Sequence, residues 1–296
     1  MANVDFIKKN WFKLAGVILF IIILSKTDFG GVFIILKKIS ILKVITAISV
    51  FYILILIKSF KLKLLINEIS IPIKKMYILN MRGMYFGLVT PGRVGELVRI
   101  KFLTDLGVSR FTGFLTVIGD RVFDVLVVVA SSIFYLVFIE PSIIKRIPKI
   151  SVKQPVIIFL IIFAVILIGV FIYFYFKKNA VIKEYLPALK NIRFYTINSL
   201  FSFLYILCYA LQMYLLSLSL SIPLDFIKIY FCVTLMMFAN MLPITFLGLG
   251  TRDLIFIFIF SFYGISKTAA VSYSMCILFF YLINICLTFM FTIIND

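Results

Sequence analysis

Long apolar segments recur along the chain, and each is long enough to cross a lipid bilayer. Residues 155–176, 194–224 and 268–295 contain no charged side chain, whereas about 20 apolar residues suffice for one transmembrane helix. A transmembrane β-barrel would instead show weak alternation in shorter segments. The pattern therefore predicts an all-α integral membrane protein. About six full spans are expected, at residues 11–26, 40–58, 111–139, 155–176, 196–220 and 268–294.

Two further apolar segments, 78–106 and 226–263, are interrupted by Pro and Gly. Pro removes a backbone donor and clashes with the preceding helical turn, and Gly adopts the angles that a chain reversal needs. Such breaks are tolerated at membrane depth only where protein or water covers them. We therefore predict two broken, re-entrant helical hairpins inside the bundle, although eight ordinary spans with proline kinks are an alternative. The expected break residues are Pro91, Gly92, Gly95, Pro243, Gly248 and Gly250.

The two halves of the chain repeat the same order of predicted elements. Residues 1–139 and 140–296 each contain two spans, a hairpin and a final span, and the second copy starts from the opposite side of the membrane. This order is typical of inverted-topology repeats, in which interrupted helices meet near the bilayer midplane. We predict one transmembrane domain, 1–296, built from two such repeats.

The basic residues suggest an orientation. Lys and Arg number 30 against 12 acidic residues, a net charge of +18, and most lie in short segments beside helix ends. This distribution favours positive-inside topology and anionic lipids over nucleic acid. With Lys58 and Lys61 counted as cytoplasmic, it predicts a multi-pass protein of the cell membrane with both termini in the cytoplasm. The first span lacks a small-residue cleavage site, so we expect it to be retained rather than removed as a signal peptide.

Histidine and cysteine usage narrows the chemistry. The sequence has no His, which excludes His-based acid–base catalysis and His metal ligands. Its four Cys lie in apolar segments without CxxC spacing, so they are expected to be small buried hydrophobic residues. We predict no metal site, no cofactor and no catalytic residue.

Charged residues nevertheless fall at membrane depth, in three groups. They are Arg93, Glu96 and Arg99; Asp120, Arg121 and Asp124; and Arg252 and Asp253. A charge at the bilayer centre costs about 2.5–3.5 kcal/mol on insertion scales, so such residues usually face the bundle interior and pair. Asp120 and Asp124 share a helix face, and Arg121 is close enough in sequence to reach Asp124.

Two interpretations of these charges stay open. In the first, they are ion pairs that hold the helices in register. In the second, Arg93, Arg121 and Arg252 converge on an anion, because guanidinium is always charged and matches phosphate oxygens. The carboxylates would then hold the Arg side chains, or receive a cationic group of the substrate. Helix N-termini after the two glycine breaks would add positive dipole ends.

Three segments carry a family resemblance: PGRVGELVRIKFL, then IGDRVFDVLVVV, then LPITFLGLGTRDLIF. In this order they resemble the flippase-like membrane family, which includes the membrane domain of lysylphosphatidylglycerol synthase. The third segment departs from the family pattern, with Leu249 between two glycines and Asp253 where Glu is common. The residues matching the family motifs are Pro91, Gly92, Arg93, Gly95, Glu96, Arg99, Asp120, Arg121, Asp124, Pro243, Gly250, Arg252 and Asp253.

The resemblance implies a domain that moves polar lipids between leaflets. Members that make the lysyl lipid carry a soluble C-terminal transferase domain, and since this chain ends at Asp296 we expect the synthase activity not to extend to it. The hypothesis is translocation, without catalysis, of a phospholipid or polyprenyl-phosphate lipid with an anionic head group. Its alternatives are an integral-membrane transferase acting on a lipid and a small-anion transporter or channel. Substrate binding is assigned to Arg93, Arg121, Arg252, Glu96, Arg99, Asp120, Asp124 and Asp253.

The expected partners are that lipid and the membrane, and no nucleic acid. A second copy of the chain and a separate soluble lipid-modifying enzyme are further candidates. Transport against a gradient would need an energy source, and the sequence contains no GxxxxGK[ST] nucleotide-binding loop.

Overall fold

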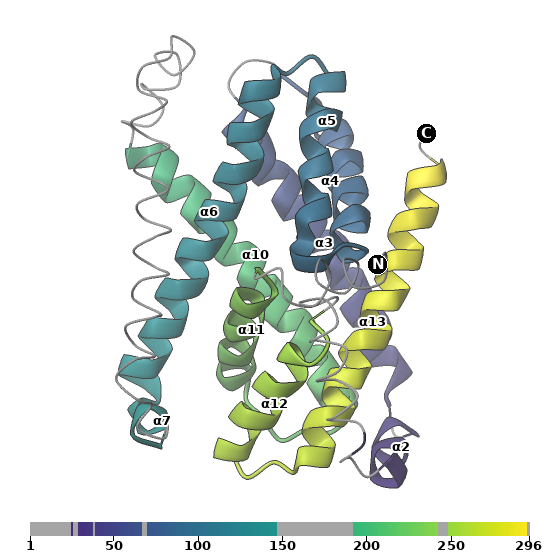
Figure 1. The fold of residues 1–296 in the computed structure, drawn as a ribbon, viewed down its shortest axis with the longest axis vertical. Helices are drawn as coiled ribbons and strands as arrows, with labels where there is room; N and C mark the ends of the chain where they lie inside the picture. The colour runs from purple at the N-terminus through teal and green to yellow at the C-terminus, as the bar shows by residue number, and fades with distance from the viewer. Residues whose placement is uncertain are drawn as a thin grey trace, which may run out of the picture. The chain divides into compact units, whose positions relative to one another are not determined.

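The structure is a computed structural model that describes residues 25, 29–37, 39–66, 70–146, 192–241 and 248–294. The predicted span 155–176, the predicted span 11–26 except Ser25, and the break residue Pro243 lie outside them. Every regular element among the described residues is a helix (Figure 1), so the all-α prediction is confirmed. Within the described ranges, four helical segments are long and apolar enough to cross a membrane. They are α3 (Ile41–Leu65), α6 (Arg110–Phe134) with its π-helical extension η2 (Tyr135–Ile139), α10 (Ile192–Ser219) and α13 (Lys267–Ile294).

The remaining helices are shorter. They are α2 (Phe29–Lys37), α4 (Ile73–Leu88), the 3-10 helix η1 (Pro91–Leu97), α5 (Val98–Asp105), α7 (Pro141–Arg146), α11 (Phe226–Met241) and α12 (Thr251–Phe262). The described residues up to Ile133 and from Ser199 onward form one compact unit, and those within Phe134–Asn198 belong to a second. The site described below lies within the larger unit. The sequence pattern did not predict α2, which packs against α13.

Helix α3 is longer than predicted, and this changes the place of two lysines. It continues past residue 58 to Leu65, so Lys58 and Lys61 lie within the helix, where they are 7% and 0% exposed. Their assignment to a cytoplasmic segment was wrong because the predicted span was ended at Lys58, whereas paired charges can lie inside a membrane helix. These two charges therefore do not support an orientation, and the position of the termini stays a prediction.

The first break lies at Pro91. Thr90, before it, is extended (φ −122°, ψ 143°), because the proline ring disfavours helical angles in the preceding residue. The Thr90 hydroxyl donates to the Phe86 carbonyl at 2.8 Å and accepts the Gly95 N–H at 2.7 Å. A Cβ atom on Gly95 would collide with the Phe86 carbonyl, so this close approach of two backbone segments requires glycine.

The second break lies between α11 and α12. Gly248 and Gly250 have φ values of 72° and 80°, a left-handed conformation that glycine adopts without steric cost. Asp253, in the first turn of α12, accepts the Gly250 N–H at 2.7 Å and so satisfies one donor at the helix N-terminus. Asp253 therefore has a structural role at the start of α12.

The larger unit contains the same succession of elements twice. A long helix, a short helix, a break, a short helix and a long helix occur in α3–α6 and again in α10–α13. In Figure 1, α4 and α5 lie side by side in the upper part of the view, and α11 and α12 lie together in the lower part. The 3-10 helix of the first break contacts α11, the helix that leads into the second break. The repeat symmetry and the re-entrant path of the hairpins stay predictions.

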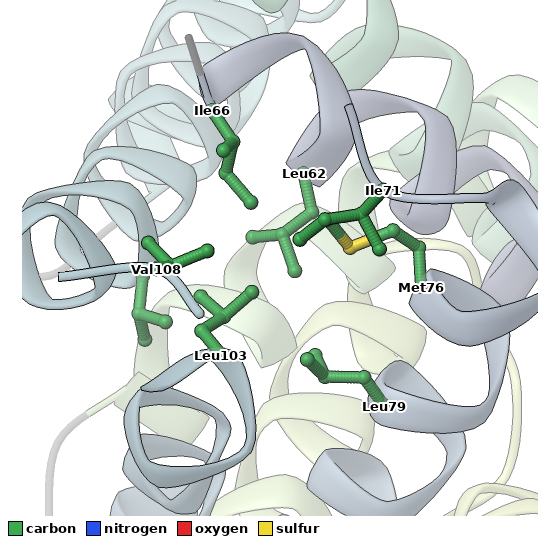
Figure 2. Close-up of a cluster of buried hydrophobic side chains, with 8 residues drawn as sticks. Leu62, Ile66, Ile71, Met76, Leu79, Leu103 and Val108 are labelled. Carbon is green, nitrogen blue, oxygen red and sulfur yellow. The ribbon is translucent and has the colours of Figure 1, made fainter. Parts of the chain in front are cut away.

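An apolar cluster joins the helices around the first hairpin (Figure 2). It brings together the C-terminal end of α3, the start of α4, α5 and the start of α6. Its members are Leu62, Ile66, Ile71, Met76, Leu79, Leu103, Val108 and Val117. Leu62 directly follows Lys61, and Val117 lies one turn before Asp120. This packing therefore fixes the register at which charged side chains of α3 and α6 face each other.

Candidate functional site

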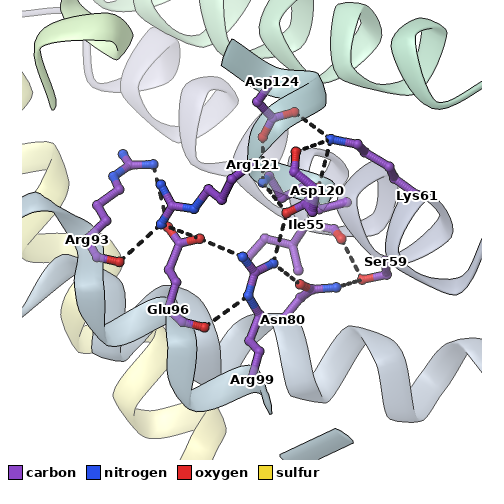
Figure 3. Close-up of polar contacts among 11 residues, drawn as sticks. Ile55, Ser59, Lys61, Asn80, Arg93, Glu96, Arg99, Asp120, Arg121 and Asp124 are labelled. Carbon is purple, nitrogen blue, oxygen red and sulfur yellow. Dashed lines mark hydrogen bonds and ion pairs between the residues drawn. The ribbon is translucent and has the colours of Figure 1, made fainter. Parts of the chain in front are cut away.

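Eight charged side chains from α3, η1, α5 and α6 meet inside the larger unit (Figure 3). We call them the buried ion network. Its members are Lys58, Lys61, Arg93, Glu96, Arg99, Asp120, Arg121 and Asp124. The first and second groups of charges from the sequence therefore lie together, joined by two lysines that the sequence interpretation placed elsewhere.

Two carboxylates of α6 bind both lysines of α3. Lys58 Nζ lies 2.9 Å from Asp120 Oδ2 and 2.9 Å from Asp124 Oδ2. Lys61 Nζ lies 2.8 Å from Asp120 Oδ1 and 2.6 Å from Asp124 Oδ1. The four-residue spacing of the acids and the three-residue spacing of the lysines place each pair on one helix face. The result is a closed arrangement of two anions and two cations.

Glu96 is the meeting point of three arginines. Its carboxylate lies 2.9 Å from Arg99 Nη2, 3.0 Å from Arg121 Nη2 and 3.9 Å from Arg93 Nη1. Arg99 also reaches Asp120 Oδ2 at 3.1 Å and so connects the two halves of the network. Arg121 was expected to reach Asp124, but its described ion pair is with Glu96, on the neighbouring 3-10 helix.

Helix α4 makes room for these side chains. A Cβ atom on Gly83 would lie 2.5 Å from Arg99 Cγ, and one on Gly87 would lie 2.5 Å from Glu96 Cγ. On the same face, Asn80 accepts a hydrogen bond from Arg99 at 3.2 Å. The sequence interpretation missed these residues, although the spacing of Asn80, Gly83 and Gly87 places them on one helical face.

The network carries more positive than negative charge. With each group in its usual charged form, five cations face three carboxylates. Buried charge without a counter-charge is strongly unfavourable in a membrane protein interior. The arrangement therefore favours the arrival of an anion.

A pocket opens on one side of the network. About 350 Å³ of space is free of protein atoms there, and this volume includes the open mouth of the pocket. Its walls come from α3, η1, α6, α10 and the last turns of α11. The lining residues are Lys58, Arg93, Glu96, Arg121, Asp124, Tyr205, Met237 and Asn240. The pocket thus lies between the first break and the helix end that precedes the second.

Arg93 is held in an unusual backbone conformation at this pocket. Its φ is 54°, in the left-handed region that costs a non-glycine residue roughly 1–2 kcal/mol. Its carbonyl oxygen accepts a hydrogen bond from Arg121 Nη2 at 3.1 Å. Strain of this kind persists where the surroundings enforce it, and it is concentrated at functional sites.

Arg252, the third predicted arginine, lies in a different environment. It is fully buried in α12 and does not line the pocket. Its Nε donates to Ser274 Oγ at 2.7 Å, and its Nη2 lies 3.7 Å from Asp253 Oδ1. Arg93 and Arg121 thus line one pocket, and Arg252 is not among its lining residues. The convergence of the three arginines on one anion stays a prediction.

A row of tyrosines connects Arg252 with the pocket. The Arg252 guanidinium lies 5.9 Å from the ring centre of Tyr281, whose hydroxyl shares a hydrogen bond with that of Tyr209. The Tyr209 ring is parallel to that of Tyr205, at 6.4 Å between centres. Tyr205 lines the pocket, and Lys58 Nζ lies 4.7 Å from its ring centre.

Comparison with known proteins relates the chain to a family. A family model described as the lysylphosphatidylglycerol synthase TM region matches residues 10–287, a range that includes the whole ion network and pocket. Among curated proteins and among solved structures, nothing matches the chain. Within the described ranges, no group of three His, Cys, Asp or Glu side chains gathers to hold a metal ion.

Proposed function

The chain belongs to the family of lysylphosphatidylglycerol synthase TM regions, and on this premise we propose that it moves a polar lipid with an anionic head group between membrane leaflets. The family and the four candidate spanning helices identify a multi-pass membrane protein with a lipid-related role. The proposal adds that the protein binds the head group and lets it pass through the membrane, without forming or breaking a covalent bond.

One observation carries the proposal: a pocket with surplus positive charge lies inside the bundle, beside a helix break. Arg93 and Arg121 face this pocket with side chains that are 19% and 24% exposed, whereas the other three cations of the network are almost completely buried. Guanidinium groups bind phosphate oxygens through paired, charge-assisted hydrogen bonds. These two residues are therefore assigned to the head-group phosphate.

The other residues of the network hold Arg121 in position and help to release the phosphate. Lys58, Lys61 and the two aspartates hold α3 against α6, which keeps Arg121 in place on α6. Glu96 binds Arg121 at 3.0 Å and so competes with a phosphate for it. Binding that is strong enough for entry but weak enough for exit is what passage through a membrane site requires. The acyl chains remain in the lipid, so that only the head group enters the pocket.

The test is movement of fluorescent lipids in vesicles that contain the purified protein. A membrane-impermeant quencher reports how much labelled phospholipid has changed leaflet. We expect the full chain to accelerate this change, and Arg121→Gln to remove most of the acceleration. Arg110→Gln, at an exposed position of α6, is the matched control and should leave it intact.

Other results would favour the alternatives. A new lipid species in the same vesicles, found by mass spectrometry, would support a transferase. Ionic current across a planar bilayer, without redistribution of lipid, would support an anion channel. Equal lipid movement by the full chain and by Arg121→Gln would remove the phosphate-binding role of Arg121.

A further inference from the structure

We infer that this pocket selects a head group with two negative charges, a phosphomonoester, over a phosphodiester with one. This inference rests on the proposed function and narrows it to a substrate class. It follows from the pairing of charges in the network, which leaves two cations at the pocket, Arg93 and Arg121, without a carboxylate of their own.

Three cations of the network are matched by its three carboxylates. Lys58 and Lys61 both bind the two aspartates of α6 at 2.6–2.9 Å. Arg99 binds Glu96 at 2.9 Å and is 2% exposed. These three cations are the most buried ones, and their partners hold them in closed arrangements. They serve as internal counter-charges.

The two remaining cations are those with open donors. The structure gives the Arg93 guanidinium no hydrogen bond within the described residues, and its ion pair with Glu96 spans 3.9 Å. Arg121 hydrogen-bonds the Arg93 carbonyl through Nη2, the same atom that contacts Glu96. Arg121 also lines the pocket. The surplus of two positive charges thus coincides with the two arginines that line the pocket, since Lys58, which also lines it, is held by both aspartates.

Neutral groups complete the pocket wall. Tyr205 and Asn240 line it from α10 and α11, and the side-chain oxygen Oδ1 of Asn240 is buried with no hydrogen-bond partner among the described residues. The carboxylates at the wall, Glu96 and Asp124, are already counted in the network. A dianion would bring the site to neutrality, whereas a monoanion would leave one buried positive charge uncompensated. The second negative charge of a dianion strengthens its hydrogen bonds with the two guanidinium groups. We therefore expect roughly tenfold selectivity for the dianion over the monoanion, which corresponds to about 1.4 kcal/mol.

The experiment compares lipids with the same acyl chains and different head-group charges in the vesicle assay at pH 8.5. Phosphatidic acid carries two negative charges and phosphatidylglycerol one. Phosphatidylethanolamine has no net charge, and lysyl-phosphatidylglycerol carries a cationic lysyl group beside its phosphate. We expect phosphatidic acid to move about ten times faster than phosphatidylglycerol, and the last two to move slowest.

A pH titration provides an internal control. The second pKa of a phosphomonoester is about 6, so at pH 5.5 phosphatidic acid loses most of its second charge while phosphatidylglycerol keeps its single one. The sequence has no His, and the titratable groups facing the site are Lys58, Arg93, Glu96, Arg121, Asp124 and Tyr205. None of these residue types has an ordinary pKa between 5.5 and 8.5. The selectivity for phosphatidic acid should therefore fall severalfold.

A charge variant tests the same point from the side of the protein. Arg93→Gln leaves a surplus of one, so the ratio of phosphatidic acid to phosphatidylglycerol movement should fall toward one, while Arg110→Gln keeps the ratio of the unmodified chain. Equal movement of both lipids at pH 8.5, or a ratio that neither pH nor Arg93→Gln changes, would overturn the inference.

Binding in detergent separates this inference from the proposed function. Short-chain phosphatidic acid, short-chain phosphatidylglycerol and inorganic phosphate are compared for the rise in Tm that each produces. A larger rise with phosphatidic acid, even without lipid movement in vesicles, would support the charge selectivity and reject translocation. A larger rise with inorganic phosphate would assign the site to a soluble anion and overturn the lipid part of the inference. No preference for either dianion would overturn it entirely.

Discussion

Cations of the same network should respond very differently to removal, and Lys61 and Arg93 are the clearest contrast. We predict that Lys61→Met destabilises the protein strongly, whereas Arg93→Gln leaves stability nearly unchanged and slows the movement of phosphatidic acid toward that of phosphatidylglycerol. Lys61 is fully buried and contacts two carboxylates at 2.6 and 2.8 Å. Arg93 is partly exposed, and its described ion pair spans 3.9 Å.

The magnitudes follow from these contacts. Breaking a buried ion pair by removing one partner usually costs about 3–5 kcal/mol, because the other charge stays buried. Lys61→Met lowers the net charge of the network, but it leaves Asp120 and Asp124 to share Lys58, so we expect a loss in that range. A long, partly exposed ion pair contributes on the order of 0–1 kcal/mol. We therefore expect a loss for Arg93→Gln of at most about 1 kcal/mol.

The measurement is reversible unfolding in mixed detergent, followed by circular dichroism in phosphate-free buffer. The double variant Lys61→Met/Asp124→Asn removes one cation and one anion together, and should recover part of the stability lost in Lys61→Met. Double-variant coupling between contacting charges is typically about 0.5–3 kcal/mol. A loss for Arg93→Gln as large as that for Lys61→Met, or additive losses in the double variant, would refute this division of the network.

Three further changes test the elements that position the site. Gly95→Ala should lower Tm by several degrees because its Cβ meets a backbone carbonyl, whereas Gly119→Ala, whose Cβ meets nothing within 4 Å, should not; equal Tm values would contradict the close approach at the first break. Gly87→Ala should displace Glu96 and slow lipid movement severalfold in the vesicle assay, and an unchanged rate would show that Glu96 does not need this position. Asp253→Ala should destabilise the protein by about 1–3 kcal/mol, since a buried N–H donor loses its acceptor; unfolding in mixed detergent measures this, and no loss would argue against the cap.

The apolar pattern predicted the long helices well because each long uncharged segment has few alternatives in a membrane. The predicted span 268–294 agrees with α13, Lys267–Ile294, and 111–139 agrees with α6 and its extension, Arg110–Ile139. The break at Pro91 was also predictable, because proline constrains both its own backbone and that of the residue before it. These features depend on local sequence alone.

The pairing within the network was not predictable in the same way, because it depends on which helices lie side by side. Arg121 is three residues before Asp124, but Asp124 is held by two lysines, and Arg121 instead reaches Glu96 at 3.0 Å. The lysines themselves were counted as cytoplasmic charges at the end of a span. A usable signal was present: Lys58 and Lys61 have helical spacing, like the two aspartates of α6, and opposite charge.

The two interpretations of the membrane-depth charges are therefore parts of one arrangement rather than alternatives. Ion pairs hold the helices in register where cations and carboxylates are equal in number, around Lys61 and Asp124. The surplus appears only at the pocket, where Arg93 adopts a left-handed backbone and Arg121 lies beside it. A purely structural network would have no reason to bury two extra cations at a break. A binding site would need the matched pairs as its support, because the open arginines can keep their positions only if the helices that carry them are fixed.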